Sequence, residues 1–292
     1  MIAAVVISAG ILLAQPVTTP ADTACGAMAG AAGLLERAEG RVLLLGERHG
    51  TREAPAVAGQ LACLALNQGE SVVLAMEISA AEQERLDVYI GSDGSMAARR
   101  TLFEGSSFWD GEIHDGRSST AWLQLVDAVR IWSGRGSPIR LVAVDRGPDD
   151  AGVPGPQPRD RVMARNLEAL HGGESRVIFL SGNIHARRTQ MRYGERVLET
   201  VGTYMPPDTY YTVNLIGDGG ESWVCIGTSM EDVECGPRPL AEIDLSGEPR
   251  PLAEEELVAI PHLAALLEAY HEIVYLGPVS TAEPAIEQLA TD

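Results

Sequence analysis

The stretch Val42-Leu-Leu-Leu-Gly-Glu-Arg-His-Gly-Thr-Arg-Glu53 joins a short apolar run to a group of polar residues. A run of this length with almost no polar residue is typical of a strand buried on both faces of a parallel sheet. Open α/β sheets bind their ligands at the carboxyl ends of such strands. We therefore expect the polar residues after Leu45 to lie at a functional edge of the sheet.

Three more short runs are mostly apolar in the same way, at residues 71–76, 139–144 and 176–180. Between the runs, apolar residues recur at the 3.6-residue spacing of amphipathic helices. One such stripe is marked by Val57, Leu61 and Leu64 and another by Met163, Leu167 and Leu170, and residues 119–132 form a third helix that begins with a hydroxyl cap. The alternation predicts an α/β fold with a mostly parallel sheet flanked by helices.

The pattern changes after Arg188. Residues 210–216 and 222–226 are predicted to form an antiparallel pair joined through the glycine-rich turn at 217–220, as part of an antiparallel C-terminal extension. A short helix and strand around 262–276 are expected to close the sheet, and the Pro- and Glu-rich stretch 236–256 is expected to loop over the surface. Residues 147–158 are dense in Pro and Gly and are interpreted as a flexible connection or a lid. Residues 25–292 are read as one α/β domain.

A second copy of the first motif follows the strand at 176–180. Gly182-Asn-Ile-His-Ala-Arg-Arg188 repeats the spacing Gly-x-x-His-x-x-Arg found at 46–52. Because parallel strands end at the same edge of a sheet, His49 and His185 are expected to face one cleft, where they could divide acid and base roles or share a metal. Glu47 lies two residues before His49, so both side chains point the same way in an extended chain. A carboxylate there would orient the ring and raise its proton affinity; the alternative is a strand–helix turn whose polar groups cap the helix.

Other charged residues follow the same strands. Glu77 directly follows an apolar run, so it either enters the site or caps the next helix. Arg117 lies in an insertion rich in aromatic and ionisable residues, where it could clamp a carboxylate or an oxyanion and Asp115 could orient it, unless Asp115-Gly is only a turn. The catalytic candidates are His49, Glu47, Glu77 and His185, and the substrate-binding candidates are Arg52, Arg117, Arg159, Asn183 and Arg188.

Charge and cysteine content restrict the classes of function. The chain has 292 residues with 22 Lys and Arg against 41 Asp and Glu, a formal charge of −19, which makes nucleic acid a poor partner. The apolar run at 1–14 is too short for a membrane span and precedes a polar, Pro-containing stretch. Residues 1–24 are therefore interpreted as a signal peptide, which leaves no stable membrane span in the mature chain, although a misjudged start codon or a buried helix would also explain the run.

Four cysteines are an even count, as an oxidising compartment favours, and Cys225 and Cys235 flank a turn that a local disulfide could close. The expected location is the periplasm or the extracellular space. Several common motifs are missing from the sequence, namely Gly-x-Ser-x-Gly, the P-loop, Gly-x-Gly-x-x-Gly, His-Glu-x-x-His and Cys-x-x-Cys.

The motifs at 46–53, 75–77, 115–119, 159–166 and 182–186 together resemble the erythromycin esterase / ChaN / Tiki superfamily over roughly residues 40–190. The resemblance implies an α/β fold with its site at the strand ends. In the esterase branch the first-motif histidine is the general base that activates water, which assigns that role to His49 and assisting roles to Glu47, Glu77 and His185. Tiki-like relatives bind a divalent metal at similar positions, and ChaN-like relatives are exported haem-binding proteins of iron uptake.

The sequence departs from the esterase pattern in one spacing. Glu47 and His49 are separated by one residue, as in the ChaN and Tiki branches, where esterases have two. The leading hypothesis is an exported hydrolase that activates water for attack on an ester, lactone or amide. The alternative is a haem- or metal-binding uptake protein without catalysis, so the partner is a small-molecule substrate or haem, and the cofactor, a divalent metal or haem, stays open.

Overall fold

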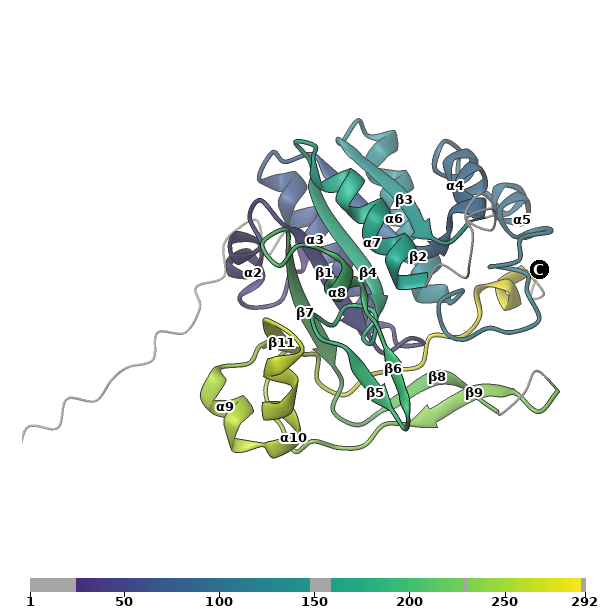
Figure 1. The fold of residues 1–292 in the computed structure, drawn as a ribbon. Coiled ribbons are helices and arrows are strands. Elements are labelled where there is room, and N and C mark those ends of the chain that lie inside the picture. Colours follow the sequence, from purple (N-terminus) through teal and green to yellow (C-terminus); the bar gives the residue numbers. More distant parts are fainter. Residues whose placement is uncertain (1–24, 148–158, 228–230, 290–292) are drawn as a thin grey trace, which may run out of the picture.

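A computed structural model of the chain describes residues 25–147, 159–227 and 231–289 (Figure 1). The predicted signal peptide at 1–24 and all of the predicted Pro- and Gly-rich connection except Gly147 lie outside the described residues.

A seven-stranded sheet forms the centre of the fold, in the order β10-β11-β7-β1-β4-β2-β3. Neighbouring strands run parallel except at the edge, where β10 pairs antiparallel with β11. The strands are β1 (Val42–Glu47), β2 (Val72–Ser79), β3 (Ile139–Asp145), β4 (Arg176–Gly182), β7 (Tyr210–Ile216), β10 (Arg250–Pro251) and β11 (Glu272–Tyr275). The predicted α/β class is therefore confirmed, as are the four strands predicted between residues 41 and 180.

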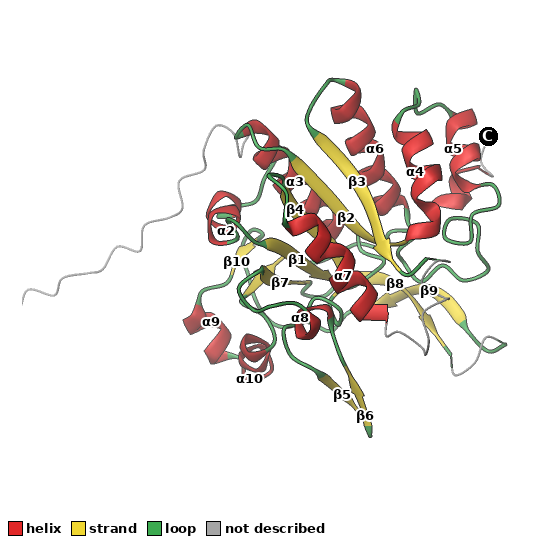
Figure 2. Cartoon of the chain, turned by 45° about the horizontal axis from the view of Figure 1, so that its top comes forward, coloured by secondary structure: helices red, strands yellow, loops and turns green. Residues whose placement is uncertain are grey.

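Helices cover both faces of this sheet because successive side chains of a strand point to opposite sides. Leu43 and Leu45 of β1 pack in one core cluster, with the helices α2 (Ala31–Arg37), α3 (Glu53–Asn67), α4 (Gln83–Ile90), α5 (Met96–Phe103) and α6 (Thr120–Gly134). Val42 and Leu44 pack in the other, with α7 (Arg159–His171), α8 (Val201–Tyr204), α9 (Glu254–Ala259) and α10 (Pro261–Ala264). Figure 2 shows α7 lying across the second face. Short 3₁₀ turns are η1 (Ala80–Glu82), η3 (Ala265–Glu268) and η4 (Ala285–Leu289).

The three predicted helices are present, and the predicted cap of α6 is Ser119. The hydroxyl oxygen of Ser119 accepts a hydrogen bond from the backbone N–H of Trp122 at 3.4 Å. A cap of this kind is worth about 1 kcal/mol. It fixes the first turn of α6, which carries the fully buried Trp122 toward the end of β1.

The predicted antiparallel pairing of 210–216 with 222–226 is wrong. β7 lies inside the main sheet, parallel to β1, and is buried along nearly its whole length. β8 (Glu221–Ile226) instead pairs with β9 (Glu234–Pro239) in a separate hairpin. The glycines between them serve close packing rather than a hairpin turn, because a Cβ at Gly220 would lie 1.9 Å from the carbonyl oxygen of Val279.

A third small sheet, β5 (Met191–Tyr193) with β6 (Arg196–Leu198), projects from the body of the molecule (Figure 2). The predicted strand around 262–276 is β11, which pairs with β7 and extends the sheet. The stretch 236–256, predicted as surface loop, contains the end of β9, the edge strand β10 and the start of α9.

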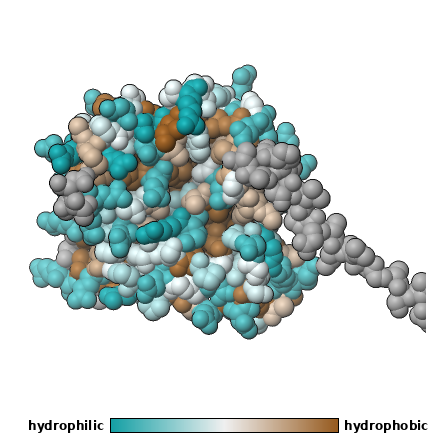
Figure 3. Space-filling model, turned by 180° about the vertical axis from the view of Figure 1, so that it is seen from behind, coloured by the Kyte–Doolittle hydropathy of each residue, from teal (hydrophilic) through white to brown (hydrophobic). Residues whose placement is uncertain are grey.

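Two disulfides link all four cysteines, Cys25 to Cys63 and Cys225 to Cys235. Two disulfides are consistent with an exported protein, because reducing compartments disfavour them. Within the described residues, no helix combines the length and apolar character that crossing a membrane requires. The face shown in Figure 3 is mostly hydrophilic, with apolar side chains in small scattered groups.

Candidate functional site

Four neighbouring strands bring polar groups to one edge of the sheet. In the order β1-β4-β2-β3 they carry Glu47, Gly182, Glu77 and Asp145 at or near their carboxyl ends. Because β4 lies between β1 and β2, Gly182 pairs in register with Glu47 and separates it from Glu77. The absence of a side chain at Gly182 leaves the space between the two carboxylates open to the histidines.

His49 forms a pair with Glu47. The Nδ1 atom of His49 lies 2.9 Å from Glu47 Oε1, which also accepts a hydrogen bond from Trp122 Nε1 at 2.8 Å. An ionised carboxylate only accepts hydrogen bonds, so in the neutral ring Nδ1 carries the proton and Nε2 keeps its lone pair. Burial raises the pKa of Glu47. Burial alone would lower the pKa of His49, but the hydrogen bond to Glu47 and the charges of Glu77 and Glu47 outweigh it and raise that pKa.

His185 forms a second pair of the same kind, with Asp160. The Nδ1 atom of His185 lies 2.7 Å from Asp160 Oδ1, in the first turn of α7. Its Nε2 lies 3.4 Å from Nη1 of Arg159. Each histidine thus has a carboxylate at Nδ1 that fixes its ring, and each presents Nε2 to the same place.

That place is the carboxylate of Glu77, which is 1% exposed. The Nε2 atoms of His49 and His185 each lie 3.7 Å from one of its two oxygens. The backbone N–H of Gly182 donates to Oε2 at 2.7 Å, and Arg117 Nη1 donates to Oε1 at 3.0 Å. Burial alone would raise the pKa of Glu77, but the charges of the two histidines, Arg159 and Arg117 lower it to about 2. Glu77 is therefore a fixed negative charge between the two rings.

The two arginines beside Glu77 have carboxylate partners of their own. Arg159 donates from Nε to Asp145 at 2.7 Å, and Arg117 donates from Nη2 to Asp115 at 2.6 Å. Burial would lower the pKa of both guanidinium groups, but these carboxylates and Glu77 raise it. Arg117 and Arg159 thus hold Glu77 ionised and are themselves neutralised.

A pocket of about 310 Å³ opens at this edge of the sheet. The β8–β9 hairpin forms the wall of the pocket opposite the strand ends, and it lies below the arrowhead of β4 in Figure 1. Trp223 fastens the hairpin to the site, since its backbone N–H donates to Gly50 and its indole N–H donates to the carbonyl of His114. The lining residues are Glu47, Arg48, His49, Asp115, Gly182, Asn183, Ile184, His185, Val224 and Cys225.

Two predicted substrate-binding residues lie outside this lining. Arg52 is exposed and donates from Nε to the carbonyl of Thr281 at 2.8 Å. Arg188 donates from Nη2 to the carbonyl of Leu267 at 2.6 Å. Both guanidinium groups tie down backbone of the C-terminal part of the chain. Of the other candidates, His49, Glu47, His185 and Asn183 line the pocket, while Glu77, Arg117 and Arg159 lie directly behind it.

Four residues of the site are not among those predicted from the sequence. Asp145 ends an apolar strand just as Glu77 does, so the same signal was present. Asp160 lies next to Arg159 in the first turn of α7, where an acidic residue also suits the helix dipole, so the sequence alone does not single it out as the partner of His185. Trp122 has no sequence signal, because only the packing of α6 brings its indole to Glu47. The fourth is Arg48, which lines the pocket between Glu47 and His49 in the sequence.

Adding one methyl group at Gly182 tests the packing of His49. A Cβ there would lie 2.8 Å from His49 Nε2 and 3.5 Å from Cδ2 of His185. We expect Gly182→Ala to displace the ring of His49 and to lower kcat/KM for the hydrolysis proposed below about 100-fold, since a displacement near 1 Å costs about that much. Gly134→Ala is the control, because a Cβ at Gly134 meets no atom within 4 Å. Equal kcat/KM in the two variants would show that the reaction does not depend on the absence of a side chain at Gly182.

The donor set does not fit the metal or haem that the resemblance allows. Within the described ranges, no group of three or more His, Cys, Asp and Glu side chains is arranged to hold a metal ion. Both oxygens of Glu77, the carboxylate that the histidines share, already accept hydrogen bonds from Arg117 and Gly182. Haem needs a broad apolar face with an outward-facing ligand, whereas both Nε2 atoms face the buried carboxylate of Glu77 beside a pocket of only about 310 Å³.

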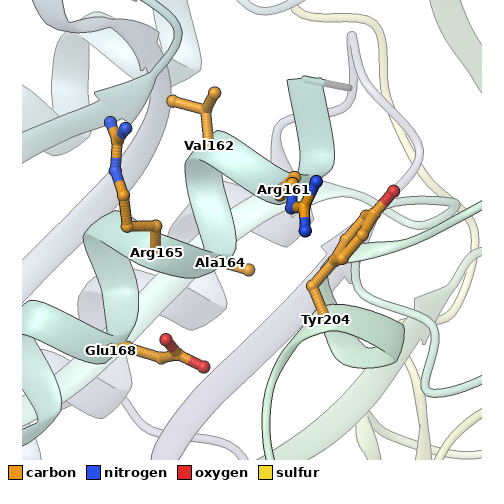
Figure 4. A pocket seen from close by; sticks show the side chains of 6 residues that line it. All are labelled: Arg161, Val162, Ala164, Arg165, Glu168 and Tyr204. Atoms are coloured by element: carbon orange, nitrogen blue, oxygen red, sulfur yellow. The ribbon is translucent and has the colours of Figure 1, made fainter. Parts of the chain in front are cut away.

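Another cavity, of about 260 Å³, lies between α7 and α8 (Figure 4). Arg161 lies over the ring of Tyr204, with its Cζ atom 5.7 Å from the ring centroid. The remaining lining residues are Val162, Ala164, Arg165 and Glu168. The lining of this cavity contains neither of the two histidine–carboxylate pairs, so the pocket at the strand ends is the candidate active site.

Comparisons with known proteins show likeness at the level of fold. No family model matches the chain, and no curated protein matches its sequence. A crystal structure of a protein from Bacillus cereus is 12% identical, covers 92% of this chain and 96% of its own, and superposes with a TM-score of 0.64. A protein described as a succinoglycan biosynthesis protein is 11% identical over 86% of this chain and 91% of its own, with a TM-score of 0.60. At these identities the likeness shows the fold alone, and the superfamily resemblance stays an expectation from the motifs.

Proposed function

We propose that the chain is an exported hydrolase that activates water for attack on an ester, lactone or amide. The observation that carries the proposal is the Glu47–His49 pair at the edge of a pocket, in which the carboxylate lies at Nδ1 and Nε2 of the neutral ring is left to accept a proton beside the buried carboxylate of Glu77. A histidine held at Nδ1 by a carboxylate is a general base, because the carboxylate stabilises the imidazolium that forms when Nε2 accepts a proton. Glu77 adds to that stabilisation from the other side of the ring.

The reaction requires two proton transfers. Nε2 of His49 takes a proton from water while the water oxygen forms a bond to the carbonyl carbon. The negative charge that develops on the carbonyl oxygen accepts a hydrogen bond from the side-chain amide of Asn183, which lines the pocket and makes no hydrogen bond within the described residues. The imidazolium of His49 then gives this proton from Nε2 to the leaving oxygen or nitrogen as the carbonyl carbon releases it, and His185, on the other side of Glu77, assists as acid or second base.

Asp160 and the two arginines position these groups and do not touch the substrate. Asp160 fixes the ring of His185 through Nδ1. Arg117 and Arg159 keep Glu77 ionised, which is a different role from the direct contact with substrate that the sequence predicted for them.

A screen of para-nitrophenyl esters, lactones and anilides at several pH values tests the proposal. General-base catalysis requires neutral His49, whose pKa is raised above its ordinary value of 6.5. We expect kcat/KM to rise with pH and to level off above that raised pKa. Absence of hydrolysis across the screen, with both disulfides intact, would contradict the proposal.

The variant Glu47→Gln gives the pH profile a sharper prediction. The neutral amide removes the charge that stabilises the imidazolium, so the pKa of His49 falls. The acid limb of the kcat/KM profile is then expected to move to lower pH, and the plateau to fall because the ring is a weaker base. Glu84→Gln, at an exposed position on α4, is the control. An acid limb that stays in place or moves to higher pH would show that Glu47 does not act through His49.

A further inference from the structure

We infer that Arg48 binds a carboxylate group of the substrate, so that the preferred substrates are small esters carrying one negative charge. The inference rests on the proposed hydrolase function and names a substrate class for it. Arg48 lies between Glu47 and His49 in the sequence and lines the same pocket. No sequence signal distinguished it from other surface arginines.

The hydrogen bonding of Arg48 leaves its binding groups free. Its Nε donates to the hydroxyl of Ser222 at 3.0 Å, and Ser222 is fully buried on β8. This bond anchors the side chain to the far wall of the pocket. The N–H groups of the two terminal nitrogens make no hydrogen bond to the described part of the chain, and no carboxylate of that part lies within ion-pair distance. They form the fork that binds a carboxylate through two parallel hydrogen bonds.

Charge balance distinguishes Arg48 from the other two arginines of the site. Arg117 and Arg159 share the carboxylates of Glu77, Asp115 and Asp145, so neither charge is available to a ligand. Arg48 is the arginine that lines the pocket, and it has no carboxylate partner among the described residues. An arginine without a carboxylate partner is unusual in this chain, because acidic residues outnumber basic ones and the formal charge is −19.

The same charges favour a carboxylate over a phosphate. Carboxylates outnumber arginines at and just behind the pocket, and this excess of negative charge repels a dianion about twice as strongly as a monoanion. The carboxylates are Glu47, Glu77, Asp115, Asp145 and Asp160, and the arginines are Arg48, Arg117 and Arg159. The pocket, of about 310 Å³, is at the small end of ligand sites, so the substrate is short. An ester of a short dicarboxylic acid with one free carboxylate fits these limits.

Two matched esters test this inference by rate. The para-nitrophenyl monoester of succinate carries a carboxylate, and para-nitrophenyl butyrate is its uncharged counterpart. We expect the wild type to prefer the succinate ester, and Arg48→Gln to lower the ratio of the two kcat/KM values about 10- to 100-fold, mainly through KM, since hydrogen bonds to charged groups are worth about 1.5–3 kcal/mol. Arg135→Gln, an exposed arginine at the end of α6, should keep the wild-type ratio. A wild type with no preference, or an Arg48→Gln ratio equal to that of wild type, overturns the inference.

Direct binding separates this inference from the hydrolase proposal. Levulinate carries a carboxylate and a ketone carbonyl but no bond to hydrolyse, and methyl propyl ketone lacks the charge. Calorimetric titration is expected to show that levulinate binds to wild type and to Arg135→Gln, and that it binds at least 10-fold more weakly to Arg48→Gln. Replacing Arg48 is expected to leave the binding of the neutral ketone unchanged. If wild type binds levulinate through Arg48 but hydrolyses no ester, the hydrolase proposal fails alone. If levulinate binds equally to wild type and Arg48→Gln, or to neither, the role of Arg48 is refuted.

Discussion

Replacing His49 by glutamine is expected to lower kcat/KM for ester hydrolysis about 10²- to 10⁴-fold, the range that a general base contributes. The amide of glutamine cannot take a proton from water near neutral pH. Its shape lets it keep a hydrogen bond to Glu47, so the pocket is expected to stay folded. The measurement is kcat/KM on the best ester of the screen, with the melting temperature of each variant as a check on folding.

His262→Gln is the matched control for this substitution. His262 is an exposed histidine on α10, on the face of the sheet that also carries α9. It should keep wild-type activity. An activity of His49→Gln within a few-fold of wild type would show that the reaction, if present, uses another base.

Glu77→Gln is expected to have the largest effect on stability. The pKa of Glu77 is lowered from 4.5 to about 2 by the surrounding cations, which corresponds to about 3 kcal/mol of folding free energy. Losing this stabilisation should lower the melting temperature by about 6–12 °C for a chain of this size. The neutral amide also places an N–H₂ group where Arg117 or Gly182 now donates, so one buried donor loses its acceptor.

The pH dependence identifies the cause of this loss. A carboxyl group whose pKa is depressed on folding contributes stability above its unfolded pKa, and the contribution disappears as pH falls toward the folded value. The difference in unfolding free energy between wild type and Glu77→Gln should therefore be full above about pH 5.5 and shrink between pH 4.5 and about 2. Glu84→Gln, at an exposed position, should cost less than about 0.5 kcal/mol at every pH. If the difference in unfolding free energy between wild type and Glu77→Gln did not change with pH, Glu77 would stabilise the fold through its packing and hydrogen bonds and not through its charge.

The sequence predicted the parts of the fold that depend on local pattern. The runs that became β1 to β4 are continuous and apolar because both faces of the sheet are covered, and this signal is visible without a structure. The pairing of β7 was not visible, because its residues pair with residues of β1 that lie 168 positions earlier, and any apolar strand could fill that position. The glycines after β7 suggested a turn, yet they permit a close approach to Val279 that only the tertiary structure creates.

The site was predictable to the extent that it depends on strand ends. Parallel strands place Glu47, Glu77 and Gly182 at one edge, so the convergence of His49 and His185 followed from topology alone. The partners of those residues depend on side-chain packing across elements. Whether Arg117 faces a ligand or a buried carboxylate is decided by Glu77 and Asp115, which are separated from each other by 38 positions in the sequence.

The claim that the two histidine–carboxylate pairs form one catalytic site is tested most directly by a double-mutant cycle. It compares kcat/KM of wild type, His49→Gln, His185→Gln and the double variant on one ester. Residues that act in one step are strongly non-additive, so the account predicts that the double variant loses little more activity than the worse single variant. A double variant whose loss equals the product of the two single losses, or a His185→Gln variant with full activity, would contradict it.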